Sequence, residues 1–216
     1  ARVARAPRSG IGRIIVLATP IGNLSDLSTR AIDALRDCDL VTAEDTRIAS
    51  RLLTSLGLKK ATIRIDEHAS DSALKSVIGR AEAGETIVVT SDAGTPGISD
   101  PGAKLVDLAY EAGVTVDAIP GPSAVTNALA LSGFFAQRYA FLGFLPRKKG
   151  GQLSEFEPYA SSTYTLVFFE SGARVGRTLS VALEALSDRR AAICREMTKL
   201  HQEVIRGRLS ELAQDV

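Results

Sequence analysis

The sequence predicts an α/β fold in which helices cover both faces of a mostly parallel sheet. Short apolar, β-branched segments alternate with amphipathic segments of helical periodicity. Helix signals stand at the junctions: Asp100 and Pro101 offer an N-cap followed by proline at the first helical position, and Gly113 ends that helix. Strands joined by crossover helices pair in parallel, and some of these strands are apolar throughout. The sheet is therefore expected to be buried on both faces.

The first part of the chain contains five expected strands with helices between them. Ser28 is placed to cap a helix that extends to Cys38. The expected strands cover residues 14–18, 40–43, 62–65, 86–90 and 115–119.

The alternation starts again near Gln137, so we place a domain boundary between Gly133 and Arg138. Residues 14–135 are assigned to an N-terminal αβα domain and residues 136–216 to a C-terminal one. The second domain is expected to be incomplete, because the chain ends inside a predicted helix. Residues 1–13 have four Arg and no acidic residue, and they are set apart as a flexible basic arm or an expression remnant. In the C-terminal domain the expected elements follow one another in this order: a strand in YAFLGF, a basic glycine-containing loop in PRKKGG, a strand in TYTLVFFES, a helix at 175–186, the segments RAAICRE and EVIRGRL, and a helix from Ser210.

The composition excludes several classes of protein. With 26 basic and 25 acidic residues the formal charge is +1, so any nucleic-acid site must be a local patch. Cys38 and Cys194 belong to no set with metal-ligand spacing, which predicts no metal site and fits a reducing compartment. No apolar run approaches the ~18 residues of a membrane span, and the N-terminus lacks a signal peptide. A cytoplasmic protein is expected.

Four loops follow strands and should meet at one edge of the sheet, where parallel α/β proteins bind ligands. They cover residues 18–26, 43–47, 91–102 and 119–124. The third has about twelve residues where ~2–6 is usual. Glycine lets backbone groups approach a ligand and proline stiffens a loop in advance, so these loops suit a small polar ligand, although ordinary turns use the same residues.

The expected ligand is not a common nucleotide. No glycine-rich loop is followed by Lys and Ser/Thr, and the first loop has one glycine where a dinucleotide fingerprint has three. Carboxylates give this edge a negative character that favours a cation or a ligand rich in hydroxyls, and an adenosyl sulfonium compound has both properties. These carboxylates are Asp26, Glu44, Asp45, Asp92 and Asp100.

Six blocks of sequence together resemble the ribosomal RNA small subunit methyltransferase I family, a branch of the tetrapyrrole methylase-like, class III S-adenosylmethionine methyltransferases. The resemblance runs from Ile14 to about Leu212. The blocks are ATPIGNLSDLSTRAIDALRDCDLVTAEDTR, SDAGTPGISDPG, IPGPSA, FLGFLPR, LVFFES and CREMTKLHQEVIRG.

The resemblance implies two αβα domains, S-adenosylmethionine bound in the cleft between them, and a homodimer. It also implies methyl transfer to the ribose 2′-hydroxyl of a cytidine in the decoding region of 16S ribosomal RNA, so the expected partner is the small subunit or its RNA. The donor-binding residues implied by motif position are Pro20, Gly22, Asn23, Asp92, Ala93, Gly94, Thr95, Pro96, Ser99, Asp100, Pro120, Gly121, Pro122, Ser123, Ala124 and Phe169.

A base that accepts the proton of the ribose hydroxyl would add about 10²–10⁴ in rate. Glu44 and Asp45 are placed first, because they end a strand beside the donor loops, although Asp45 could equally cap the next helix. The other candidates are Glu170, Glu196, Lys199 and His201. The candidate RNA-binding residues are Arg47, Arg51, Arg147, Lys148, Lys149, Arg174 and Arg177, and a solvated basic loop is the plainer interpretation of Arg147 to Lys149.

The chain departs from the family pattern in two places. It has ESGAR where Glu-Ser-Pro-His-Arg is usual, so Gly172 and Ala173 replace a proline and a histidine, and it has Gln202 where an acid is usual. The family's basic C-terminal extension is not covered. Two alternatives stay open: a tetrapyrrole C-methyltransferase and a module that binds RNA or a nucleoside without turnover.

Overall fold

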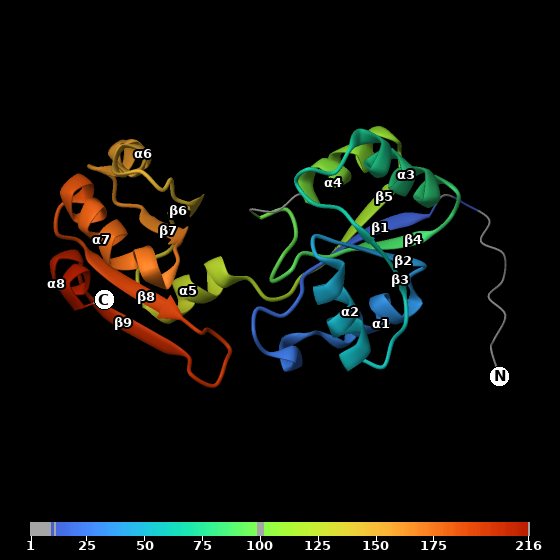
Figure 1. The fold of residues 1–216 in the computed structure, drawn as a ribbon, viewed down its shortest axis with the longest axis horizontal. Helices are drawn as coiled ribbons and strands as arrows, with labels where there is room; N and C mark the ends of the chain where they lie inside the picture. The colour runs from blue at the N-terminus through green and yellow to red at the C-terminus, as the bar shows by residue number, and fades with distance from the viewer. Residues whose placement is uncertain (1–9, 11, 99–101, 216) are drawn as a thin grey trace. The chain divides into compact units, whose positions relative to one another are not determined.

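The computed structural model describes residues 10, 12–98 and 102–215 (Figure 1). Ser99 and Asp100, two of the expected donor-binding residues, lie outside the described residues. The chain forms two compact units, the first ending at Ser123 and the second beginning at Ala124. This division differs from the expected boundary after residue 135, because helix α5 (Ala124–Ser132) packs against strands of the second unit.

The first unit contains a five-stranded sheet in the order β3-β2-β4-β1-β5, and all of its neighbouring strands pair in parallel. The structure confirms the five predicted strands to within one residue at each end. They are β1 (Arg13–Leu17), β2 (Leu40–Ala43), β3 (Ala61–Arg64), β4 (Thr86–Val89) and β5 (Thr115–Ile119).

Helices cover both faces of this sheet, as the apolar strands predict (Figure 1). The helices α1 (Thr29–Asp37) and α2 (Thr46–Ser55) pack on one face together with Ile15, Val41 and Val88. The other face carries α3 (Asp71–Glu82) and α4 (Gly102–Glu111), which pack with Ile14, Leu40 and Ile87. Successive residues of one strand thus enter opposite cores, and all four residues of β2 and of β4 are buried.

Side-chain caps fix where the helices of this unit begin. Ser28 Oγ accepts a hydrogen bond from the Ala31 amide at 3.2 Å, which confirms the predicted cap of α1. Ser70 caps α3 in the same way. Each such cap satisfies an amide that the helix leaves unpaired, and it is worth about 1 kcal/mol.

The order of the strands places a topological switch point at the carboxyl edge of the sheet. Strands β1 and β4 are neighbours, but the chain leaves β1 through α1 on one face and leaves β4 through α4 on the other. The connections that follow these two strands therefore run to opposite faces of the sheet, and ligands of doubly wound sheets bind at such a switch point.

The second unit contains two sheets of two strands each (Figure 1). Strands β6 and β7 pair in parallel, whereas β8 and β9 form an antiparallel hairpin. This core includes the fully buried Phe156. The elements after α5 are β6 (Tyr139–Phe144), α6 (Lys149–Phe156), β7 (Thr165–Phe169), α7 (Gly172–Leu186), β8 (Arg190–Arg195), β9 (Glu203–Arg208) and α8 (Leu209–Asp215), with short 3-10 turns at Leu24–Asp26 in the first unit and Glu157–Tyr159 in the second.

The second unit has one feature that the sequence did not indicate, the β8–β9 hairpin, and one expectation for it was wrong, the loop at PRKKGG. The segment between β8 and β9 is too short for a parallel crossover, which needs about a dozen residues, so these strands are antiparallel. The segment PRKKGG is only partly a loop, because α6 begins at Lys149. Gly151 allows this start, since a Cβ there would lie 2.8 Å from Cβ of Pro146.

Among the described residues, every helix is too short or too polar to span a lipid bilayer.

Candidate functional site

The loops after β1 and β4 are joined at the carboxyl edge of the first unit. The Thr19 amide donates to the Gly94 carbonyl at 2.8 Å, and the Gly94 amide donates to the Thr19 carbonyl at 3.1 Å. The structure therefore brings together two of the loops that the sequence assigns to the donor.

Hydroxyl groups of Thr19, Ser91 and Thr95 fix the same loops further. Thr19 Oγ1 donates to the Ser91 carbonyl at 3.2 Å, and Ser91 Oγ donates to the Gly94 carbonyl at 3.0 Å. Thr95 Oγ1 reaches the Pro122 carbonyl at 3.2 Å, which connects the loop after β4 with the loop after β5. Sequence reasoning missed Thr19 and Ser91, because a hydroxyl at a strand end is too common to single them out.

Small residues at this edge leave backbone groups open to a ligand. Gly22, Ala93 and Gly121 are exposed, and none has a side chain larger than a methyl group. Gly94 has a φ of +86°, which L side chains rarely adopt. Asn23 is occupied locally, since its side chain accepts from the Ser25 amide at 3.0 Å.

Gly121→Ala is expected to destabilise the protein by about 1–3 kcal/mol, because the added Cβ would lie 2.9 Å from Cβ of Ala18 and push two loops apart. Gly79→Ala is the matched control: it lies within α3 with no neighbouring atom within 4 Å, so alanine should be neutral or stabilising there. Urea unfolding measures both. Equal midpoints for Gly121→Ala and wild type would contradict a close approach of these loops.

Asp92 ties the loop after β2 to the same cluster. Its Oδ1 accepts a hydrogen bond from the Asp45 amide at 3.0 Å. All four loops predicted from the sequence thus contribute to one connected edge, to which Asp92 joins the loop after β2.

Asp45 is the N-cap of α2, as the second interpretation of this residue predicts. Its Oδ1 accepts from the Arg47 amide at 2.8 Å and from Arg47 Nε at 3.0 Å. The hydrogen bond from the Arg47 side chain, aided by the backbone amide, holds the pKa of Asp45 well below its usual range. A carboxylate stabilised in this way is a poor proton acceptor, which leaves Glu44 as the stronger candidate of the pair.

Glu170 is held within the second unit. Its side chain is only 6% exposed, and its Oε2 accepts from Thr178 Oγ1 at 2.8 Å and pairs with Arg174 at 3.0 Å. Its Oε1 accepts from the Ser171 amide at 2.8 Å. Arg174 also donates to the carbonyls of Leu145 and Pro146. This network connects the ends of β6 and β7. It engages the side chains of Glu170, which the sequence offered as a base, and of Arg174, which it offered as an RNA contact.

The remaining candidates are scattered over the two units. Lys199 pairs with Glu196 at 3.1 Å in the turn between β8 and β9, where His201 is exposed. Lys149 pairs with Glu184 at 2.7 Å. Arg51 lies exposed on α2, and Ala124 and Phe169 belong to the second unit.

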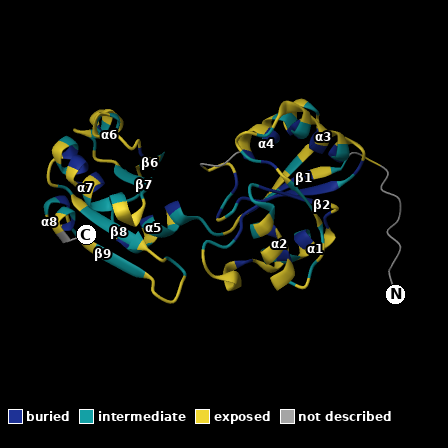
Figure 2. Ribbon diagram, viewed as in Figure 1, coloured by how far each residue is buried: buried dark blue, intermediate teal, exposed yellow. Residues whose placement is uncertain are grey.

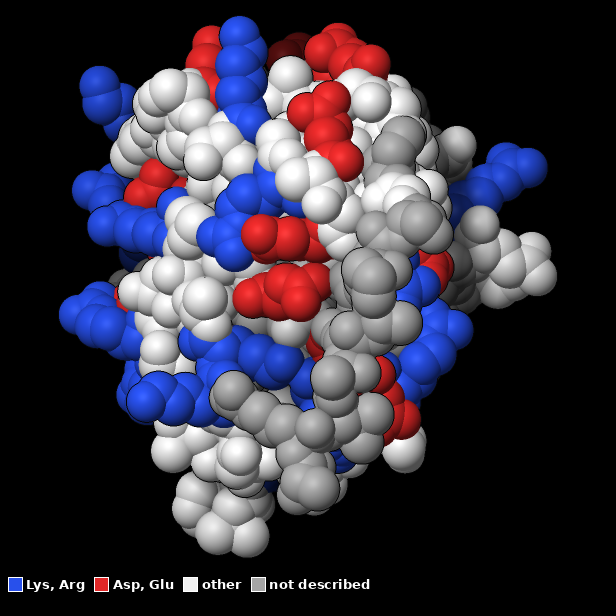
Figure 3. Space-filling model, turned by 90° about the vertical axis from the view of Figure 1, so that its right-hand side faces the viewer, with Lys and Arg blue, Asp and Glu red and all other residues white. Residues whose placement is uncertain are grey.

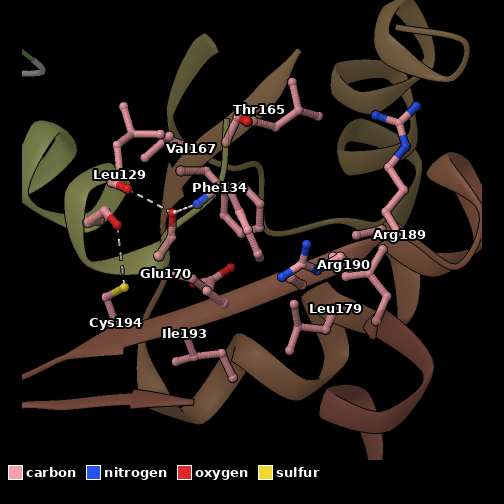
Figure 4. A pocket seen from close by; sticks show the side chains of 18 of the residues that line it. Leu129, Phe134, Thr165, Val167, Glu170, Leu179, Arg189, Arg190, Ile193 and Cys194 are labelled. Carbon is pink, nitrogen blue, oxygen red and sulfur yellow. Dashed lines mark hydrogen bonds between the residues drawn. The ribbon is translucent and has the colours of Figure 1, made fainter. Parts of the chain in front are cut away.

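A cavity of about 460 Å³ lies within the second unit (Figure 4). Residues of β7 and β8, which belong to different sheets, form much of its wall together with α5 and α7, and its lining includes Val167, Ile193, Leu129 and Leu179. Burial raises the pKa of the Cys194 thiol in this wall. This lining also includes Glu170, Arg189 and Arg190. The loop edge of the first unit remains the candidate donor site, because hydrogen bonds join there the loops that the sequence assigns to the donor.

The part of the chain that the structure describes holds no group of three or more His, Cys, Asp or Glu residues that could bind a metal ion.

The chain is similar over most of its length to known methyltransferases. The sequence profile described as tetrapyrrole (corrin/porphyrin) methylases matches residues 13–213. A Thermotoga maritima protein named ribosomal RNA small subunit methyltransferase I is 43% identical over 201 residues, which make up 93% of this chain and 90% of that protein.

Two solved structures have a similar fold. The methyltransferase CobJ has a TM-score of 0.70 at 19% identity, and the match covers 93% of this chain and 87% of CobJ. A Thermus thermophilus uroporphyrin-III C-methyltransferase, solved with S-adenosylhomocysteine, has a TM-score of 0.65 at 18% identity, over 94% of this chain and 91% of that one.

Proposed function

The chain belongs to the tetrapyrrole methylase family and, within it, to the ribosomal RNA small subunit methyltransferase I group, and from this we propose that it methylates a ribose 2′-hydroxyl of small-subunit ribosomal RNA. The proposed target is a cytidine of the decoding region. The chain is an S-adenosylmethionine-dependent methyltransferase. The 43% identity to the Thermotoga maritima relative, over nearly the whole of both chains, carries the choice of ribosomal RNA as substrate.

The loop edge of the first unit fits the donor. S-adenosylmethionine supplies a methyl group on a positively charged sulfur. The exposed backbone at Gly22, Ala93 and Gly121 offers N–H and C=O groups to its polar parts, and the hydrogen bonds of Thr19 and Thr95 hold this backbone in place beforehand. We assign donor binding to residues 20–23, 92–96 and 120–123 of this unit.

The chain's own residues have two tasks in the reaction. They hold the ribose hydroxyl in line with the donor, an effect worth up to ~7–11 kcal/mol in favourable cases. They also accept the hydroxyl proton as the new carbon–oxygen bond forms. Glu44 is proposed for this step because the Asp45 carboxylate is engaged by the amide and the side chain of Arg47.

Incubation with labelled S-adenosylmethionine and undermethylated small subunits tests the function. Label on a ribose of the small-subunit RNA is expected. Label on an added tetrapyrrole, or RNA binding without label, would overturn the proposal in favour of one of the alternatives.

The proposed setting is the cytoplasm, and the proposed active form is a homodimer. Light scattering measures the mass of this form.

RNA binding is proposed to depend on a local basic patch rather than on overall charge. On the face seen in Figure 3, Lys/Arg and Asp/Glu side chains lie close together, in keeping with the net charge of +1. Arg147 and Lys148 are exposed, and among the described residues neither forms an ion pair, whereas Lys149 pairs with Glu184.

Changing Arg147 and Lys148 together to Ala is therefore expected to weaken RNA binding and to reduce its salt dependence by about one unit of slope for each lost phosphate contact. Lys149→Ala is the matched control and should change the slope less. Titrations of RNA at several salt concentrations measure this. If the salt dependence of RNA binding has the same slope as in the wild type, Arg147 and Lys148 do not contact RNA and are ordinary solvated side chains.

A further inference from the structure

Strand β6 contains one extra residue near its end. It pairs in regular parallel register with β7 as far as Phe141, which lies opposite Val167. Two residues further along β7, Phe169 lies opposite Phe144, so three residues of β6 match two of β7. Gly143 provides the bulge, with a φ of +63°.

The bulge changes where the ring of Phe144 points. Residues three apart in a regular strand lie on opposite faces. Here the rings of Phe141 and Phe144 both contact Phe169, with centroids 5.0 Å and 5.2 Å from that ring. The extra residue therefore gathers three aromatic rings into one cluster, which we name the phenylalanine cluster.

One member of this cluster is open to solvent. Phe144 is 72% exposed, while Phe141 and Phe169 are partly buried beneath it. A large ring that only packing required would be buried, as Phe usually is. Phe144 instead presents one exposed ring that packs against Phe169, which in turn contacts Phe141.

The basic residues Arg147 and Lys148 follow Phe144 on a segment anchored to the protein. Leu145 is buried in the core of the second unit. The Pro146 carbonyl accepts from Gln152 Nε2 at 3.0 Å and from Arg174 at 3.2 Å, and Arg174 also pairs with Glu170, next to Phe169. The backbone between the aromatic ring and the two cations is therefore held in place.

We propose that the phenylalanine cluster, with Arg147 and Lys148, is a platform for single-stranded RNA. An unpaired base stacks on Phe144, and the adjoining phosphates bind the two cations. Aromatic rings beside unpaired basic side chains are how proteins bind unpaired nucleotides, whereas an apolar protein partner would leave both cations without a counter-charge. This proposal rests on the proposed function, because it specifies how that substrate is held.

The test compares Phe144→Ala with two further variants. Phe144→Tyr keeps a stacking ring, and Phe135→Ala removes a ring of similar exposure, 71%, that lies outside the cluster. A fluorescently labelled single-stranded oligoribonucleotide and its duplex are the probes. Phe144→Ala should weaken single-strand binding about five- to one-hundred-fold, with Tyr near wild type, Phe135→Ala unchanged and duplex binding little affected.

Several results would overturn the platform. They are unchanged single-strand binding in Phe144→Ala, an equal loss in Phe135→Ala, or an equal loss for the duplex. Loss of S-adenosylmethionine affinity in Phe144→Ala without loss of RNA binding would place the ring in the donor site, and a change of oligomeric mass would place it in a protein interface. If the wild-type protein binds RNA through Phe144 but transfers no label to RNA, the platform stands and the proposed function is refuted. If Phe144→Ala methylates RNA and binds it with full affinity, the proposed function stands and the platform is refuted.

Discussion

Glu44→Gln is expected to slow single-turnover methylation by about 10²–10⁴-fold while leaving the affinities for S-adenosylmethionine and RNA nearly unchanged. Glutamine keeps the shape of the side chain but cannot accept the ribose proton as a carboxylate does. Glu44 directly follows β2 and lies in the loop that Asp92 ties to the donor edge through the Asp45 amide.

Asp45 offers the matched comparison. Asp45→Asn keeps an N-cap and should methylate close to the wild-type rate, whereas Asp45→Ala should lose about 1 kcal/mol of stability with the cap of α2. Single-turnover assays and urea unfolding separate these effects. If Glu44→Gln reacts at the wild-type rate, the proton goes elsewhere, and Lys199 and His201 become the candidates to test.

Gly94→Val is expected to abolish binding of S-adenosylmethionine. Valine is poorly compatible with the φ of +86° at this position, and its Cβ would lie 3.4 Å from Cγ2 of Ile21. The paired hydrogen bonds to Thr19 would be displaced, and with them the exposed backbone at Ala93. Isothermal titration calorimetry with the donor measures the loss.

Gly57→Val separates strain from function. Gly57 has a φ of +67° just after α2, and no atom lies within 4 Å of an added Cβ. This variant should lose a similar 1–3 kcal/mol through backbone strain but bind the donor normally. Full donor affinity in a folded Gly94→Val protein would refute the assignment of this loop.

The fold of the first unit could be predicted because its signals are local. Apolar runs such as Leu40–Ala43 are buried on both faces, and Ser28 caps the helix that its position indicates. The loops at the carboxyl edge followed from strand order alone. The role of Asp45 could not be predicted, because a carboxylate directly after a strand can serve as a helix cap or as a base. Its hydrogen bond from the Arg47 amide, which identifies it as a cap, is visible only in the structure.

The second unit was harder to predict because its structure depends on non-local contacts. Lys149 begins a helix only because Gly151 fits against Pro146 and Gln152 reaches the carbonyl of that residue. The helix α5 follows the motif IPGPSA of the first unit directly, yet it packs on the strands of the second. The bulge at Gly143 depends on pairing with β7, so no pattern within β6 reveals it.

The division of the second unit into two small sheets gives the two halves of the chain unequal resistance to local opening. The strands β2 and β4 are hydrogen-bonded along both edges and fully buried, whereas β7 and β8 each have one paired edge and residues of intermediate exposure (Figure 2). The cavity of about 460 Å³ beside them removes packing that would keep them closed. Amide protons of β7 and β8 should therefore exchange with solvent before those of β2 and β4. The same open edges can accept a strand from another molecule, so warming a concentrated solution should favour aggregation that begins in this half of the chain.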